Sequence, residues 1–177
     1  MEEQLVFDTV FKPLLEAHRH LVVGAVVTEL QALGLDPTKP LRPAYPVDTF
    51  RKVVAVLGRE LVPGQPSAVQ QREVGRVYAK AFGNSMVGKA LNALASAVGR
   101  RTTINWVRRA FGATNNFTRA EVVGETDSRT TLVVHHVSQA DFLLGVLDVM
   151  SGWGRKAPAA ARLVSLEAGV ATFELTW

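Results

Sequence analysis

The segment Ser138–Trp153, SQADFLLGVLDVMSGW, decides the fold class of this chain. Its apolar residues recur at the three- and four-residue spacing of an amphipathic helix: Phe142, Leu143, Val146, Leu147 and Met150. Asp141 and Asp148 fall on another face, and Ser138 with Asp141 fits the S-x-x-D capping signature. The pattern predicts a helix that begins near Ser138 and packs one apolar stripe against a sheet.

Segments with the character of strands flank this helix in pairs. Thr118–Glu125 and Thr130–Val137 precede it, and Arg162–Glu167 and Val170–Trp177 follow it. Each pair is joined by a short turn, which predicts two hairpins. In the last segment apolar and polar residues alternate, so one face is expected to be buried, with Ala171, Phe173, Leu175 and Trp177. The order of these elements is ββ-α-ββ.

The chain before residue 117 has the periodicity of helices instead. Helices are predicted at Leu21–Leu33, Asp48–Val62, Ser67–Phe82, Asn84–Val98 and about 103–111. Ser67 and Gln70 form a further capping box at the start of the third. The expected fold class is α+β, with N-terminal helices packed on a C-terminal four-stranded antiparallel sheet. We expect one domain over residues 1–177, with a helical part at about 1–116 and the ββ-α-ββ part at about 117–177.

The composition is that of an ordinary globular protein. Apolar residues make up 47% of the 177 residues and charged residues 20%, which argues against disorder. The chain has no cysteine, so a disulfide framework and a thiolate site are excluded. Its acidic first residues and short apolar runs predict a cytoplasmic protein without a membrane span. A net charge of +4 permits an anionic partner without requiring one.

A near match to a phosphate-binding loop occurs at residues 83–90, GNSMVGKA. It ends in Ala90 where the loop of a nucleotide-binding enzyme needs a hydroxyl for magnesium. The residues before it are helical in pattern, whereas such a loop follows a buried parallel strand. We therefore interpret the match as coincidental. No arrangement of nucleophile, base and acid is visible elsewhere, so we expect no enzymatic activity.

Basic residues cluster between Arg72 and Arg109. This stretch holds eight basic residues against a single acid, Glu73. It is typical of a solvated face that pairs with acids elsewhere in the chain, although it could also bind phosphate or a carboxylate-rich surface. No zinc-finger spacing or RNA-binding aromatic motif supports a nucleic-acid partner. Neither His18 with His20 nor His135 with His136 has a spacing that chelates a metal, and His136 is expected to be half-buried beside Leu132 and Val134.

Several short patterns occur in an order that is familiar from one family. They are Ala44-Tyr45-Pro46, Pro63-Gly64, Gly75-Arg76, Val87-Gly88-Lys89-Ala90-Leu91, Gly99-Arg100-Arg101 and Thr114-Asn115-Asn116-Phe117. On their order and spacing the chain resembles the myxobacterial paralogous family of uncharacterised proteins of about this length. The resemblance covers nearly the whole chain.

That family is similar in architecture to a wider group with helices followed by ββ-α-ββ. The group contains the haem nitric-oxide sensors, the 4VR small-molecule-binding domain and the Bet3-like subunits of the TRAPP complex. The resemblance implies a sensor, carrier or assembly module, often dimeric, with a pocket between helices and sheet. The chain departs from the haem sensors because it has no histidine between His20 and His135 and no Y-x-S-x-R motif, and it lacks the cysteines of 4VR domains. These departures argue against haem and metal cofactors.

We therefore expect a non-enzymatic module that binds a small molecule or a protein. If there is a small ligand, it should be apolar with one anionic group. The candidate ligand-binding residues are Arg76, Arg100, Arg101, Trp106 and Asn116. Arg76 and the neighbouring asparagines could instead serve only backbone and turn contacts. Two alternatives stay open: a homodimeric scaffold that assembles through Asn84–Val98 without a ligand, and a binder of anionic partners, including nucleic acid, through the basic cluster.

Overall fold

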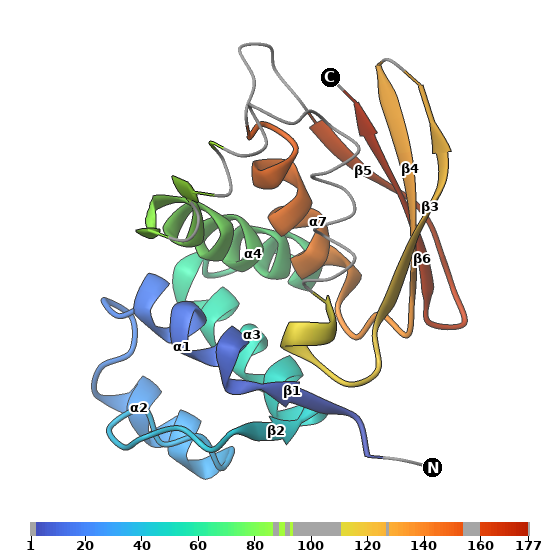
Figure 1. The fold of residues 1–177 in the computed structure, drawn as a ribbon. Helices are drawn as coiled ribbons and strands as arrows, with labels where there is room; N and C mark the ends of the chain where they lie inside the picture. The colour runs from blue at the N-terminus through green and yellow to red at the C-terminus, as the bar shows by residue number, and fades with distance from the viewer. Residues whose placement is uncertain are drawn as a thin grey trace.

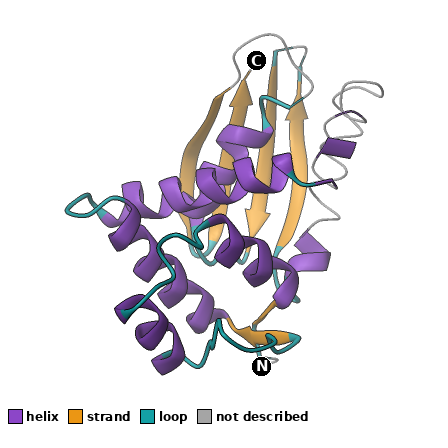
Figure 2. Cartoon of the chain, turned by 90° about the vertical axis from the view of Figure 1, so that its left-hand side faces the viewer, coloured by secondary structure: helices purple, strands orange, loops and turns teal. Residues whose placement is uncertain are grey.

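The helices of this protein gather on one face of a C-terminal antiparallel sheet, as two views a quarter turn apart show (Figures 1 and 2). The computed structural model describes residues 3–86, 89–90, 93, 111–126, 128–153 and 160–176. Predictions for Asn84–Val98 beyond residue 93, and for residues 103–110, therefore lie outside the described part. The α+β class and the four-stranded antiparallel sheet are confirmed.

The sheet is formed by the two predicted hairpins. Its strands are β3 (Arg119–Glu125), β4 (Arg129–His135), β5 (Ala160–Glu167) and β6 (Val170–Thr176). They lie in the order β3-β4-β6-β5, and every neighbouring pair is antiparallel. Ala171, Phe173 and Leu175 are buried as their alternation predicts. The ββ-α-ββ order is thus confirmed, with the two hairpins joined side by side through β4 and β6.

Within the described residues, the N-terminal half contains four labelled helices and a small two-stranded sheet. The helices are α1 (Asp8–Ala17), α2 (Ala25–Ala32), α3 (Val47–Leu61) and α4 (Ser67–Asn84), and β1 (Leu5–Phe7) pairs with β2 (Ala44–Pro46). The predicted helix at Leu21–Leu33 begins only at Ala25, after Gly24 at a φ of +51°. None of the helices within the described ranges has the length and apolar character needed to cross a membrane.

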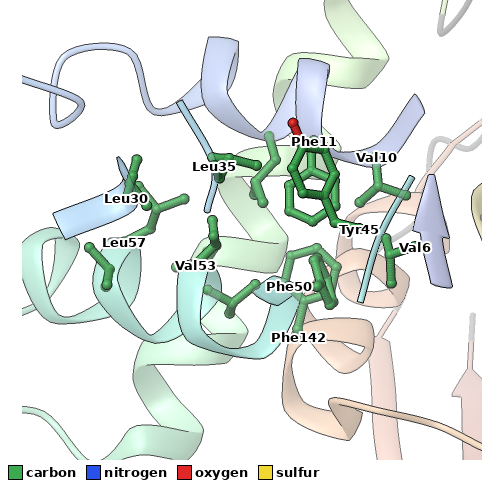
Figure 3. Packing of buried hydrophobic residues seen from close by; sticks show 14 of the residues in the cluster. Val6, Val10, Phe11, Leu30, Leu35, Tyr45, Phe50, Val53, Leu57 and Phe142 are labelled. Carbon is green, nitrogen blue, oxygen red and sulfur yellow. The ribbon is translucent and has the colours of Figure 1, made fainter. Parts of the chain in front are cut away.

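Aromatic and aliphatic side chains from α1, α2, α3 and β2 form the core of the helical half. Figure 3 shows Phe11 beside Tyr45, with Phe50 meeting Phe142 below them. The ring centroids of Phe11 and Tyr45 are 4.9 Å apart, and those of Phe50 and Phe142 are 5.4 Å apart with the planes at 90°. Edge-to-face contacts of this kind add to the free energy of burial. Phe142 belongs to the C-terminal half, so the core links both halves of the chain.

The helix predicted from Ser138–Trp153 is α7 (Ala140–Met150), and it lies between α4 and the sheet (Figure 1). It buries two faces rather than the single predicted stripe. Phe142 and Val146 join the helical core, while Leu144 and Leu147 join a second core with the sheet. An amphipathic pattern records only one polar and one apolar side, so it could not show that the apolar side would be shared between two neighbours.

Both predicted capping boxes are wrong. Gln139 is the residue that precedes α7, so Ser138 lies one position too early, and the Gln139 side chain donates to the carbonyl of Arg51 in α3 at 3.0 Å. Ser67 is already the first residue of α4, where its hydroxyl accepts from Gln71 at 3.0 Å. In each case the serine lies one position away from the residue that directly precedes the helix. A cap works only from the residue just outside the first turn.

His136 is exposed, which contradicts its predicted place beside Leu132 and Val134. Strand β4 ends at His135, and the next residue turns to a φ of +55°. Alternation along a strand predicts burial only while the strand continues. His135 instead lies 2.9 Å from Glu121 on the neighbouring strand.

The crossing of α4 and α7 brings the two helix backbones into direct contact. A Cβ atom placed on Gly75 would lie 2.1 Å from the carbonyl oxygen of Phe142, and one on Gly145 would lie 2.0 Å from the carbonyl oxygen of Arg72. Both distances are far below van der Waals contact, so only glycine fits at either position. Two glycines that face each other across a helix pair thus determine how closely the halves approach.

We predict that Gly145→Ala lowers the free energy of unfolding by about 3 kcal/mol, because the added methyl forces the helices apart. Urea denaturation would measure the change. Gly152→Ala is the matched control, since its methyl would meet nothing nearer than the Val149 carbonyl oxygen at 3.5 Å. Its effect should stay within about 0.5 kcal/mol. Equal losses in the two variants would contradict the role of the crossing.

His18 is fully buried in the turn after α1. Its Nδ1 donates to the carbonyl of Leu14 at 2.8 Å, and its Nε2 has no partner within the described residues. Burial lowers the pKa of His18 below its ordinary value of 6.5, an effect that outweighs the opposing hydrogen bond to Leu14. The neutral ring is therefore the form that the folded protein holds.

Stability should consequently fall as the pH drops below about 6.5, because the unfolded chain then binds a proton that the folded chain does not. The slope for one such group approaches about 1.4 kcal/mol per pH unit. His18→Gln should flatten the dependence measured by urea denaturation between about pH 7.5 and about pH 5.5. His20→Gln, at an exposed position, should change it much less, because the charge of His20 is only the smallest of the causes that act on the pKa of His18. A slope that survives His18→Gln would assign the effect to other groups.

Candidate functional site

A cavity of about 340 Å³ lies where the helical half meets the ββ-α-ββ half. This volume is at the lower end of the range of small-molecule pockets, about 300–1,000 Å³. Its wall comes from five parts of the chain that are distant in sequence. The lining residues are Val6, Thr9, Val10, Phe50, Tyr78, Phe82, Phe111, Ala113, Thr114, Asn115, Phe117, Thr118, Val137, Ser138, Gln139, Phe142, Leu143, Val146, Leu147 and Met150.

The crossing of α4 and α7 positions one side of this wall. Tyr78 and Phe82 follow Gly75 at helical spacing, so they share the side of α4 that faces α7. The ring of Tyr78 is 5.7 Å from that of Phe142, measured between centroids. Phe82 stacks on Trp153 with centroids 6.1 Å apart and planes at 15°. The aromatic part of the wall is therefore held in place by ring contacts on both helices.

The segment 111–118 forms the opposite side, and its polar groups mostly satisfy one another. The hydroxyl of Thr114 donates to the carbonyl of Phe111 at 2.9 Å, and that of Thr9 donates to the carbonyl of Ala113 at 2.7 Å. The side-chain oxygen of Asn115 accepts from the backbone of Phe117 and Thr118 at 3.1 and 2.6 Å. These bonds leave an apolar surface facing the cavity, because the polar groups are used within the segment.

No Asp, Glu, Lys, Arg or His is present among the described residues that line the cavity. The nearby charges pair elsewhere. The Nε of Arg72 donates to the Asp148 carboxylate at 2.8 Å, and the Nη2 of Arg72 lies 2.7 Å from the same carboxylate. Asp148 also accepts a hydrogen bond from the backbone N–H of Ala161 at 3.2 Å. This ion pair joins α4, α7 and β5. It also agrees with the interpretation that acids of the C-terminal part neutralise the basic cluster.

Tyr78 supplies a hydroxyl to this uncharged wall. Within the described residues the Tyr78 hydroxyl makes no hydrogen bond. Burial raises the pKa of Tyr78 to about 12, so the phenol keeps its proton at any physiological pH. It can therefore donate a hydrogen bond but cannot supply a charge.

Of the predicted site residues, Arg100, Arg101 and Trp106 lie outside the described part of the chain. Arg76 lies on α4 beside the crossing, where its Nη1 is 3.4 Å from Glu73, and it is not among the lining residues. Asn116 accepts from the backbone of Leu5 at 2.9 Å through its side-chain oxygen and donates to the Glu3 carbonyl at 3.0 Å. Asn116 thus makes the backbone contacts that were considered as an alternative to ligand binding. These contacts connect the segment 111–118 to the N-terminus.

The aromatic wall was not singled out by sequence reasoning. Phe142 and Val146 appeared only as part of a core stripe, and Tyr78 had no signal beyond its spacing from Gly75 and Phe82. A cavity wall has the same apolar periodicity as a packed core, so periodicity cannot distinguish them. A turn-rich crossing from the helices to the sheet was predicted at Gly112–Asn116; the chain is helical up to Thr114, and the crossing begins only at Asn115.

Solved structures with this fold are H-NOX domains. One, from work on modulating haem redox potential through porphyrin distortion, is 19% identical, with a TM-score of 0.66 over 97% of this chain and 99% of that one. An oxygen-binding H-NOX domain related to soluble guanylate cyclases is 18% identical, with a TM-score of 0.64 over 95% and 93%. An H-NOX mutant from K. algicida with unliganded Fe(II) is 12% identical, with a TM-score of 0.64 over 96% and 95%.

These similarities show the fold. H-NOX domains are a different group from the Bet3-like subunits. A haem would need an iron ligand in the cavity, ordinarily histidine, cysteinate or tyrosinate. The chain has no cysteine, and none of its four histidines lines the cavity. Its two tyrosines are Tyr45, which is not on the wall, and Tyr78, whose high pKa opposes a tyrosinate. These residues do not fit a haem.

No curated protein matches the chain in sequence. A family match does cover it almost completely, from residue 4 to residue 177. The family is described as a protein of unknown function, DUF2378, which agrees with the expected membership of a family of uncharacterised proteins. With this coverage, the chain belongs to the DUF2378 family.

Proposed function

We propose that this protein is a small-molecule-binding sensor module that holds an apolar ligand in the cavity between its two halves. The observation that carries the proposal is the uncharged, aromatic-lined cavity of about 340 Å³. Pockets of this kind, with an apolar wall and a few polar groups, are the usual sites for small ligands. The proposal also accords with the H-NOX fold, one example of which is an oxygen-binding domain related to guanylate cyclases.

The position of the cavity suits a sensor. Val6, Thr9 and Val10 come from the N-terminal end of the chain, while Leu143 and Leu147 come from the helix that packs on the sheet. A ligand therefore contacts both cores at once, and it stabilises the arrangement of the two halves to which it binds best. This differential affinity is what converts occupancy into a conformational signal.

Binding without catalysis is the second part of the proposal. The described wall offers hydroxyls, two primary amides and one thioether, but no carboxylate, imidazole or amine that could act as a general base. A homodimer, the kinship with 4VR and Bet3-like modules, and a cytoplasmic location remain predictions of the same proposal. The alternative, a scaffold that assembles through Asn84–Val98 without a ligand, also remains a prediction. Most of the helix predicted at Asn84–Val98 lies outside the described residues.

We predict that the protein binds N-phenyl-1-naphthylamine, an uncharged fluorescent probe, saturably and at one site. Val137→Phe should abolish the fluorescence increase, because Val137 lines the cavity and the larger ring occupies its space. Val133→Phe is the matched control, since Val133 lies nearby on β4 and does not line the cavity. Thermal melts of both variants would show that the fold is retained.

The outcome that contradicts the proposal is probe binding that both variants retain. Native mass spectrometry gives an independent measure of the same site. Extra mass that disappears on denaturation, and that is absent from Val137→Phe, would identify a ligand that co-purifies with the protein.

A further inference from the structure

The described cavity wall contains many rings and no charge. Six of the lining residues are aromatic: Phe50, Tyr78, Phe82, Phe111, Phe117 and Phe142. Flat ring systems pack against such a wall in offset or edge-to-face contacts that add to the free energy of burial. The shape of the site therefore favours a planar ring compound over a flexible chain.

A charged ligand would lose its hydration on entering this cavity without gaining a counter-ion from the described wall. Transfer of an unpaired ion to such surroundings is strongly unfavourable. Arg72 and Arg76, the described arginines of the basic cluster, already pair with Asp148 and Glu73 and do not line the cavity. The expected anionic group on the ligand therefore has no partner among the described lining residues.

Hydrogen bonding on the wall is also unevenly distributed. The hydroxyls of Thr9 and Thr114 and the side-chain oxygen of Asn115 are used within the protein. Tyr78 keeps a hydroxyl without a partner among the described residues, on a ring that contacts Phe142. Tyr78 is half-buried, and its unpaired hydroxyl is available to donate to a ligand in the cavity.

We propose, on the basis of the function proposed above, that the cavity selects an uncharged planar ring compound with a carbonyl-type oxygen, which accepts a hydrogen bond from the Tyr78 hydroxyl. An aromatic ketone or a quinone has this chemistry. The aromatic wall supplies most of the contact area, and Tyr78 determines the orientation of the ring. Tyr78 is thus the donor that distinguishes a ring compound with a carbonyl-type oxygen from a hydrocarbon of the same size, while the buried side-chain oxygen of Gln139, which has no partner among the described residues, can only accept.

Three naphthalenes of similar size test the proposal by displacement of N-phenyl-1-naphthylamine: 2-acetylnaphthalene, 2-ethylnaphthalene and 2-naphthoate. The acetyl compound should bind about fivefold more tightly than the ethyl compound, because the net free energy of one hydrogen bond corresponds to about this ratio of affinities. The naphthoate should bind at least about tenfold more weakly than the acetyl compound, since it must lose its hydration.

Tyr78→Phe should reduce the acetyl-to-ethyl ratio to about one while the probe still binds, because only the hydroxyl is removed. Tyr45→Phe is the matched control. Tyr45 is the other tyrosine of the chain, its hydroxyl accepts from the Arg42 backbone at 2.9 Å, and it does not line the cavity. The acetyl-to-ethyl affinity ratio of the Tyr45→Phe variant should equal that of the unmodified protein.

Equal affinities for the acetyl and ethyl compounds, a ratio that survives Tyr78→Phe, or tightest binding of the naphthoate would each overturn this assignment. Such a result would leave the cavity as a binding site, provided that Val137→Phe still abolishes probe binding. If neither the probe nor any naphthalene binds, the sensor function fails, and the ligand class fails with it.

Discussion

The close contact between Gly75 and Gly145 is the constraint on which the rest of this structure depends. The two backbones approach so closely that a methyl group on either glycine would overlap a carbonyl oxygen of the other helix. Because α4 belongs to the helical half and α7 to the ββ-α-ββ half, this single crossing sets the distance between the two halves. Around it, the Arg72–Asp148 ion pair adds a third connection, to β5.

The cavity follows from this arrangement. At the crossing the helices touch through small residues, and beyond it the larger side chains of Tyr78, Phe82, Phe142 and Val146 extend into the space between the halves. The charges of the same helices pair elsewhere, through Arg72 with Asp148 and Arg76 with Glu73. An uncharged interior beside paired charges is energetically reasonable, since ions remain near water and apolar rings do not.

The relationship to H-NOX domains illustrates how one fold can carry different sites. The overall architecture matches over nearly the whole chain, yet the described cavity wall holds no histidine or cysteine, and burial opposes a tyrosinate at Tyr78. A fold determines where a pocket lies, whereas the side chains on its wall determine what it binds. In this chain the described side chains of the wall are mostly aromatic rings, aliphatic groups and uncharged polar groups.

The sequence by itself determined the element types, the ββ-α-ββ order and the strand residues that face the core, because periodicity and turn residues are local signals. Only the tertiary structure decided the caps, the exposure of His136, the two buried faces of α7, the close contact at Gly145 and the place of Tyr78 on the cavity wall. These features depend on which distant segment lies opposite each residue. A pattern along one helix shows that a side is apolar, but not whether a sheet, a glycine or a cavity faces it.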